Sequence, residues 1–253
     1  MANPVLEVRF ADARADARAD APGGAGRRAM TVQGSVVRSL SFVALTIAGG
    51  VAGWASVARV PAGVAEFPGT LWVVGVAAFV LAVVAAVNPR AAGPCGAGYA
   101  LGQGAVLGGV SAVYQTRFDG IVLQAVAITI AAFLAVLVLR LAGVVRATGR
   151  FRRIVFTAMS ALLLVYLCTW LVDLLTPGVP YAHEARALGV GLALLVCVLA
   201  AANFVIDFDA VEAGAEHGAP QYMEWYAAFG LTVTLLWLYV SVLRLLAMLA
   251  ARR

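Results

Sequence analysis

Seven stretches of the chain are apolar around most of the circumference of a helix and approach the roughly 20 residues that cross a bilayer. Proline, glycine and charged residues separate them. The predicted helices cover about residues 39–59, 70–88, 97–115, 120–145, 153–175, 186–206 and 222–249. None shows the alternation of a transmembrane β-strand, and the short loops favour antiparallel neighbours. The pattern predicts an all-α, polytopic membrane protein, built as one bundle of about seven transmembrane helices.

The first 35 residues differ from the rest because they lack the apolar segment of a signal peptide. Residues 11–18 alternate alanine with aspartate and arginine, which is a charge-balanced repeat of low complexity. Such segments bury too little apolar surface to fold alone. We therefore predict a flexible cytoplasmic tail at residues 1–35 and one transmembrane domain at residues 36–253.

Composition indicates that lipid is the solvent. The chain is 63% hydrophobic and 12% charged, whereas soluble domains carry about 25% charged residues. All 18 basic residues are arginine, and most lie in short loops, where they orient a membrane protein and do not indicate nucleic-acid binding. More of them fall on the side of the N-terminus. We expect a bacterial inner-membrane protein with its N-terminus inside and its C-terminus outside, unless the last segment re-enters without crossing.

Small residues recur at the spacing that lets membrane helices approach closely. Glycine pairs four residues apart occur at Gly49/Gly53, Gly98/Gly102 and Gly104/Gly108. Such pairs are typical of helix packing, with a glycine-lined pore as the alternative. The three cysteines, Cys95, Cys168 and Cys197, have no metal-ligand spacing and are expected to pack as small apolar residues.

Ionisable side chains at bilayer depth are the first functional candidates, because each charge there costs roughly 2.5–3.5 kcal/mol. The candidates within or beside the predicted helices are Arg140, Asp173, Asp207, Asp209, Glu224 and Arg244. For Arg140 and Arg244 we expect long side chains that reach the membrane surface. Arg244 has a second interpretation, an ion pair with Asp173, which the topology places on the same side.

The acidic residues gather around the last predicted hairpin. Asp207 and Asp209 end the sixth helix, Glu212 and Glu216 follow, and Glu224 opens the seventh, with no arginine between Arg186 and Arg244. Clustered carboxylates without a fixed cation share protons and attract hard cations such as Ca²⁺. Asp207 and Glu224 flank the hairpin, so we expect them at a similar depth, facing each other. Ordinary solvated helix ends are the alternative.

The sequence lacks the motifs of the common enzyme classes. It has no phosphate-binding loop, no dinucleotide fingerprint, no nucleophile elbow and no H-E-x-x-H. No pairing of a nucleophile with a base can be assembled from the remaining residues. We therefore expect no enzymatic activity and no cofactor, apart from Ca²⁺ as a transported ion.

Several segments, in their order and spacing, resemble the Bax-inhibitor/YccA-like (transmembrane Bax-inhibitor-motif) family, and a bacterial branch of it in particular. The segments that carry the resemblance are Met30–Gly34, Tyr99–Ser111, Asp119–Thr129, Asp207–Asp209, Gln221–Tyr226 and Leu236–Leu246. The resemblance covers the chain from Met30 to Arg253. It implies a fold in which two layers of three helices surround the last helix.

The same resemblance implies a pH-sensitive Ca²⁺ leak gated by two aspartates that share a proton. Asp207 matches the first aspartate, and Asp209 stands where the family has glutamine. The second aspartate position holds Thr234, and the family's asparagine three residues later is Trp237. Glu224 is the candidate substitute, although it lies about 15 Å along the helix axis from Thr234. The expected ion or proton site is thus Asp207 with Glu224 or Asp209.

A second hypothesis comes from relatives that modulate membrane proteases or stress responses by contact. In that case the protein would be an interaction protein, and the segment 1–35 would dock the partner. Deleting this segment would separate the two hypotheses, because only an interaction function depends on it.

Overall fold

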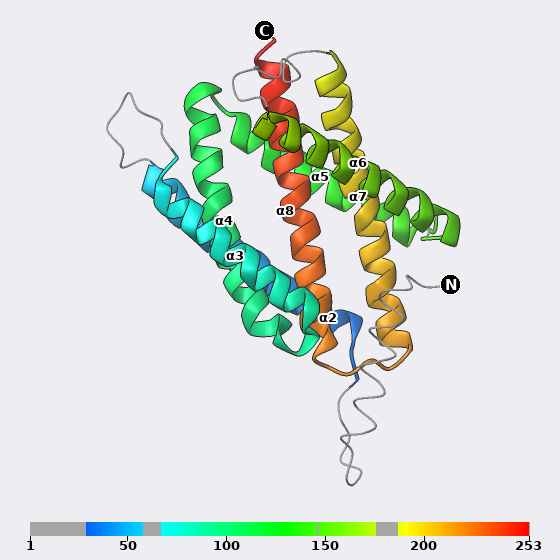
Figure 1. The fold of residues 1–253 in the computed structure, drawn as a ribbon. Coiled ribbons are helices and arrows are strands. Elements are labelled where there is room, and N and C mark those ends of the chain that lie inside the picture. Colours follow the sequence, from blue (N-terminus) through cyan, green and yellow to red (C-terminus); the bar gives the residue numbers. More distant parts are fainter. Residues whose placement is uncertain (1–28, 58–66, 146, 176–186, 253) are drawn as a thin grey trace.

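A computed structural model describes residues 29–57, 67–145, 147–175 and 187–252, which form a bundle of long helices (Figure 1). A short 3₁₀ turn, η1, joins two of them. The elements are α2 (Val32–Val57), α3 (Gly69–Val87), η1 (Pro89–Ala91), α4 (Ala92–Arg117), α5 (Ile121–Leu141), α6 (Gly149–Leu175), α7 (Ala187–Glu216) and α8 (Met223–Ala250). The predicted all-α class and the seven predicted helices are confirmed.

Six of the helices in the described part of the chain are long and apolar enough to cross a membrane, and α4 is the exception. Helix α4 is rich in glycine and lies against α2, α3 and α8. Since its neighbours cover much of its surface, α4 does not need the strongly apolar surface that lipid demands. Helix α3 is the opposite case, because large apolar side chains such as Trp72 and Phe79 are about two-thirds exposed, at 69% and 68%.

Helix α8 occupies the centre of the bundle, as the resemblance implies. It packs against α2, α4, α5 and α7. Two hydrophobic clusters meet on its surface: Leu231 and Leu238 pack with residues of α5 and α7, whereas Phe229 and Leu236 pack with residues of α2, α3 and α4. Helix α8 therefore joins the two halves of the bundle. Its C-terminal end and the N-terminal end of α2 lie at opposite ends of the bundle (Figure 1).

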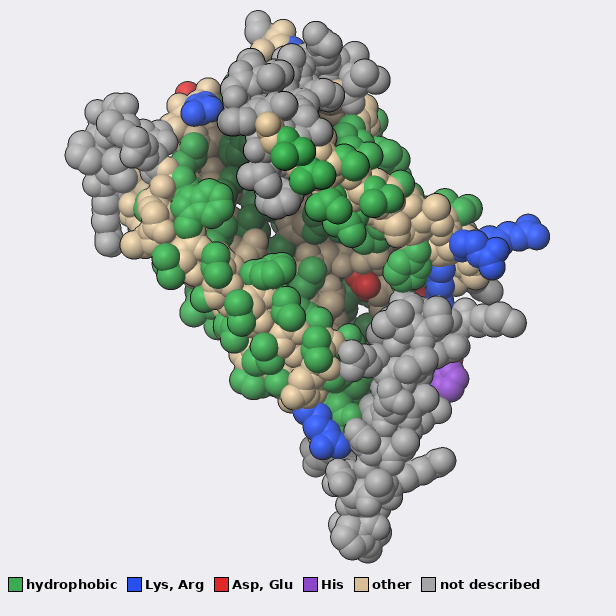
Figure 2. All heavy atoms as spheres, in the orientation of Figure 1, with side chains coloured by type: hydrophobic (Ala, Val, Ile, Leu, Met, Phe, Trp, Pro, Cys, Tyr) green, Lys and Arg blue, Asp and Glu red, His purple; other side chains and the backbone are tan. Residues whose placement is uncertain are grey.

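The outer surface agrees with a lipid environment. Figure 2 shows hydrophobic side chains over much of the visible face, with arginines toward its edges. Large exposed apolar residues occur on several helices, including Ile47 on α2, Leu123 on α5 and Leu163 on α6. Side chains of this size would be buried in a soluble bundle, so lipid contact follows from their exposure.

The glycine pairs serve helix packing. A Cβ atom on Gly53 would collide with the backbone of Ala105, and one on Gly108 would collide with the carbonyl of Gly50. Helices α2 and α4 therefore meet backbone to backbone. Gly98 and Gly102 face side chains of α3 instead. The packing interpretation of these glycines is confirmed.

Two predicted boundaries are wrong. Helix α2 begins at Val32, inside the predicted tail, and Met30 is buried and donates its N–H to the Ala219 carbonyl at 2.7 Å. Residues 1–28 of that tail lie outside the described residues. Helix α7 continues to Glu216 and does not stop before Asp207, because no proline interrupts it and its acidic residues find partners on other helices.

Candidate functional site

Asp207 lies in the interior of α7 and faces α8. Its Oδ2 accepts a hydrogen bond from the Thr234 hydroxyl at 2.6 Å. The Asn203 amide, one turn earlier on α7, donates to Asp207 Oδ2 at 3.3 Å and to Thr234 Oγ1 at 3.0 Å. The three side chains thus form a closed hydrogen-bonded triangle between α7 and α8. Within the described part of the chain, no arginine or histidine pairs with Asp207.

A small cavity of about 60 Å³ adjoins Asp207. Tyr226, Gly230 and Leu231 of α8 and Val211 of α7 line it. A cavity of this size has room for a water molecule or a small ion beside the carboxylate. Asp207 itself is half-buried, so its carboxylate is shielded from bulk solvent without being sealed off.

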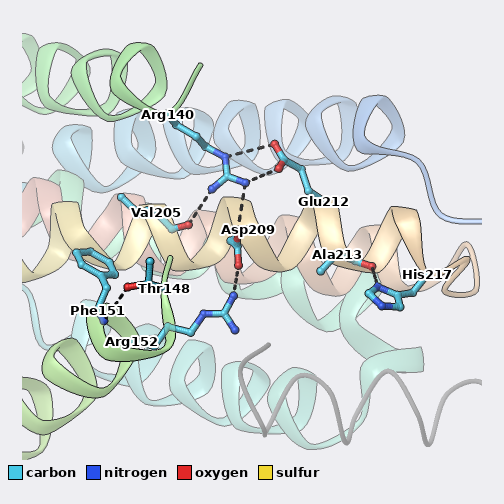
Figure 3. Close-up of polar contacts among 9 residues, drawn as sticks. All are labelled: Arg140, Thr148, Phe151, Arg152, Val205, Asp209, Glu212, Ala213 and His217. Carbon is cyan, nitrogen blue, oxygen red and sulfur yellow. Dashed lines mark hydrogen bonds and ion pairs between the residues drawn. The ribbon is translucent and has the colours of Figure 1, made fainter. Parts of the chain in front are cut away.

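Two further acidic residues of α7, Asp209 and Glu212, are neutralised by arginines from α5 and α6. Arg152 forms an ion pair with Asp209, and Arg140 lies 3.8 Å from the same carboxylate. Arg140 also binds both carboxylate oxygens of Glu212, at 2.6 and 3.3 Å, and donates to the Val205 carbonyl at 3.2 Å (Figure 3). The prediction of an acidic cluster without a local fixed cation is therefore wrong.

The error has a simple physical origin. The sequence between Arg186 and Arg244 holds no arginine, but α5 and α6 bring Arg140 and Arg152 beside the end of α7. Arg140 was expected to reach the membrane surface. It instead uses three of its nitrogens on α7, because a bidentate carboxylate contact is stronger than a contact with water.

Glu224 ties the start of α8 to the start of α2. Glu224 is only 2% exposed. Its Oε1 accepts hydrogen bonds from the backbone N–H of Thr31 at 2.8 Å and from the Thr31 hydroxyl at 3.0 Å. Its Oε2 forms an ion pair with Arg38. Arg38 also lies over the Trp225 ring, 4.9 Å from its centroid. A Cβ atom on Gly34 would collide with the Glu224 carboxylate, so glycine leaves room for this contact.

Asp207 and Glu224 do not face each other. The partner of Asp207 is Thr234, ten residues and about 15 Å along α8 from Glu224. The expectation of a similar depth is wrong, because α7 runs nine residues beyond Asp207 before the hairpin turns. Glu224 therefore does not substitute for an aspartate at position 234.

The remaining candidates lie away from this region. Arg244 is exposed, and its Nη1 donates to the Tyr166 hydroxyl at 3.3 Å. Asp173 belongs to α6, but its side chain lies outside the described residues, so the predicted pair of Arg244 with Asp173 stays a prediction. Among the residues that the structure describes, no three His, Cys, Asp or Glu side chains come together as a metal site.

Sequence reasoning missed four partners: Asn203, Thr31, Arg38 and Arg152. Asn203 lies four residues before Asp207, so it shares a helix face with it, and this spacing was a visible signal. Thr31 and Glu224 both belong to segments that carry the family resemblance, which hinted at contact. No local pattern pointed to Arg38 or Arg152, because their partners lie far away in the sequence.

Comparison with known proteins gives one family. A protein-family model described as "Bax inhibitor 1 like" matches residues 3–251, which is nearly the whole chain. No curated protein matches the sequence.

Proposed function

The chain belongs to the Bax inhibitor 1 like family of membrane proteins, and from this premise we propose that it is a pH-sensitive cation leak in which Asp207 binds a proton or Ca²⁺. In this proposal the contact between α7 and α8 opens or closes the path. Neither an enzymatic activity nor a resident cofactor is part of it. The bacterial inner membrane and an inward N-terminus belong to the proposal as well.

One observation carries the proposal: Asp207 lies nine residues inside the end of α7, and within the described residues its side-chain partners are the neutral groups of Thr234 and Asn203. Asp209 and Glu212 pair with arginines of α5 and α6, and Glu224 pairs with Arg38. A carboxylate held only by neutral donors in a membrane is stabilised when a mobile cation or a proton joins it. The arrangement therefore supports a role for Asp207 in reversible cation binding.

The oxygens around Asp207 favour a transient Ca²⁺ ion over a permanently bound one. Carboxylate, hydroxyl and amide oxygens are the hard donors that Ca²⁺ takes, but a stable Ca²⁺ site needs about 6–8 oxygens. Asp207, Thr234 and Asn203 supply only a few. An ion would keep much of its hydration shell there and leave readily. A proton needs only the carboxylate, so protons and Ca²⁺ compete for the same group.

Thr234 gives this chain a different gate from the aspartate pair that the resemblance implies. The hydroxyl stands at the second aspartate position and donates to Asp207. Two carboxylates would share a proton, whereas Asp207 with Thr234 carries at most one negative charge. We therefore expect a single titrating carboxylate to control the path.

The test is Ca²⁺ flux into proteoliposomes at about pH 6 and about pH 8, the range in which buried carboxylates change their protonation. Wild-type protein should conduct, with a rate that differs between the two pH values. Asp207→Asn should abolish this difference, because the amide cannot take up a proton. Glu212→Gln removes a charge from the same helix, at a side chain that is 54% exposed and paired with Arg140, and should leave the difference intact. Absence of flux at both pH values, or an unchanged pH response in Asp207→Asn, would refute the proposal.

The alternative of an interaction protein that modulates a membrane protease stays a prediction. Its docking element would lie mostly in residues 1–28, outside the described residues, and nothing in the described helices favours it over transport. Deleting residues 2–28 should leave flux unchanged if transport is the function.

A further inference from the structure

A large cavity lies between α2, α4, α5 and α8, on the other side of α8 from the contact with α7. Its volume is about 570 Å³, within the range of ligand-binding pockets, roughly 300–1,000 Å³. Asp207 and Asn203 do not line it. The cavity is therefore separate from the carboxylate that the proposed function uses.

The walls of the cavity offer few free polar groups to water. None of the described residues that line the cavity is charged. Three of its hydroxyl side chains, Ser111, Thr129 and Thr232, donate to carbonyls of their own helices, and Tyr239 bonds to Ser111 at 2.7 Å. Among the described residues, the buried hydroxyl of Thr46 has no hydrogen-bond partner. A trapped water needs two to four polar partners, so one such hydroxyl does not hold water in place.

The cavity runs from the lipid-facing surface to the core of the bundle. At its rim, Val51 is 65% exposed and Ile130 is 53% exposed, and both belong to the surface that lipid covers. At its floor, Leu107 of α4 and Leu236 of α8 are each only 7% exposed. The cavity thus opens on the lipid-facing surface of the protein and extends inward as far as the central helix α8.

We propose that the acyl chain of a bilayer lipid inserts into this cavity and packs against α8. A hydrocarbon chain matches the apolar walls, and burying it there costs no hydrogen bonds. A helix of a partner protein does not fit, because a helix is about 10–12 Å wide and two turns of it exceed the available volume. The bilayer supplies acyl chains at the rim at very high local concentration.

Photolabelling tests this proposal. The protein is reconstituted into vesicles of phosphatidylethanolamine and phosphatidylglycerol that contain a phosphatidylcholine with a diazirine at the end of one acyl chain. After illumination, digestion and mass spectrometry locate the adducts. An inserted chain should label Leu107 and Leu236, which bulk lipid does not reach, in addition to exposed residues such as Phe79 on α3.

A matched pair of variants separates insertion from general lipid contact. Val126→Phe/Ile130→Phe places two rings at the rim of the cavity and should abolish the adducts on Leu107 and Leu236. Leu123→Phe/Ile128→Phe adds two rings to the same helix at exposed positions outside the cavity and should keep them. Labelling of α3 should stay the same in both variants.

Two results would overturn the proposal. Adducts confined to outward-facing residues in the wild-type protein would show that no chain enters the cavity, whatever the variants do. Equal labelling of Leu236 in the two variants would show that the label arrives by another route. Neither result depends on Ca²⁺ flux, so this proposal and the proposed function stand or fall separately.

Discussion

Replacing Glu224 by glutamine should isolate the energy of one buried ion pair. Both hydrogen bonds from Thr31 end on Oε1 of Glu224, and Arg38 binds Oε2. The glutamine carbonyl can keep both bonds from Thr31, while its amide group replaces the oxygen that faces Arg38. The substitution therefore removes the counter-charge of Arg38 and little else.

The expected loss follows from burial. Removing one partner of a buried pair costs about 3–5 kcal/mol, because the other charge is left uncompensated. The contact of Arg38 with the Trp225 ring, at 4.9 Å, offsets about 0.5–2 kcal/mol of this. We expect Glu224→Gln to lower the free energy of unfolding by about 2–4 kcal/mol, roughly a 100-fold change in the unfolding equilibrium at the middle of that range.

Equilibrium unfolding in mixed micelles of a mild detergent and dodecyl sulfate, followed by circular dichroism, measures this change. Glu212→Gln is the matched control, because Glu212 also pairs with an arginine but its side chain is 54% exposed. Arg140 is only 10% exposed, but after Glu212→Gln the Asp209 carboxylate still lies 3.8 Å from it, so its charge stays compensated. We therefore expect a loss of about 0–1 kcal/mol, as for a half-exposed carboxylate. The double variant Arg38→Gln/Glu224→Gln should recover part of the stability that either single variant loses. Equal losses for Glu224→Gln and Glu212→Gln would refute the argument from burial.

Two further predictions use the same unfolding assay. Gly53→Ala should destabilise the protein by about 1–3 kcal/mol, because its Cβ would collide with the backbone of Ala105. Gly50→Ala is the control and should be neutral or slightly stabilising, because its Cβ would lie 3.6 Å from the Gly104 carbonyl. Similar losses for both variants would contradict backbone-to-backbone packing of α2 and α4. Thr46→Val should stabilise the protein by about 1 kcal/mol, because it removes a buried hydroxyl that has no partner; a clear loss of stability would show that this hydroxyl is bonded.

The helices could be predicted from the sequence because lipid imposes a simple requirement on each of them. A long apolar stretch marks each span, and the observed helices differ from the predicted ranges mainly at their ends. The ends were harder to predict, since charged residues do not stop a helix when another helix neutralises them. Asp209 and Glu212 look like the end of a span, yet α7 continues through both because Arg140 and Arg152 pair with them.

The partners of the acidic residues were harder still to predict. Glu224 looked like a candidate for ion binding, because a carboxylate at the start of an apolar helix has no partner within its own segment. Its partners Thr31 and Arg38 lie almost two hundred residues earlier and meet it only when α2 and α8 pack together. Asp207 is different, since Asn203 lies on its own helix and Thr234 stands at the second aspartate position that the family resemblance implies.

The two-residue spacing between Asp207 and Asp209 explains why one helix carries both a structural and a candidate functional carboxylate. Each residue advances about 100° around a helix, so these side chains point to nearly opposite sides. Asp209 therefore faces α6 and α5, where Arg152 and Arg140 neutralise it and hold α7 in place. Asp207 faces α8, where it meets the neutral hydroxyl of Thr234. If Asp207 binds a cation as proposed, α7 keeps its ion pairs with Arg140 and Arg152 when that cation leaves, because these arginines bind the far side of the helix.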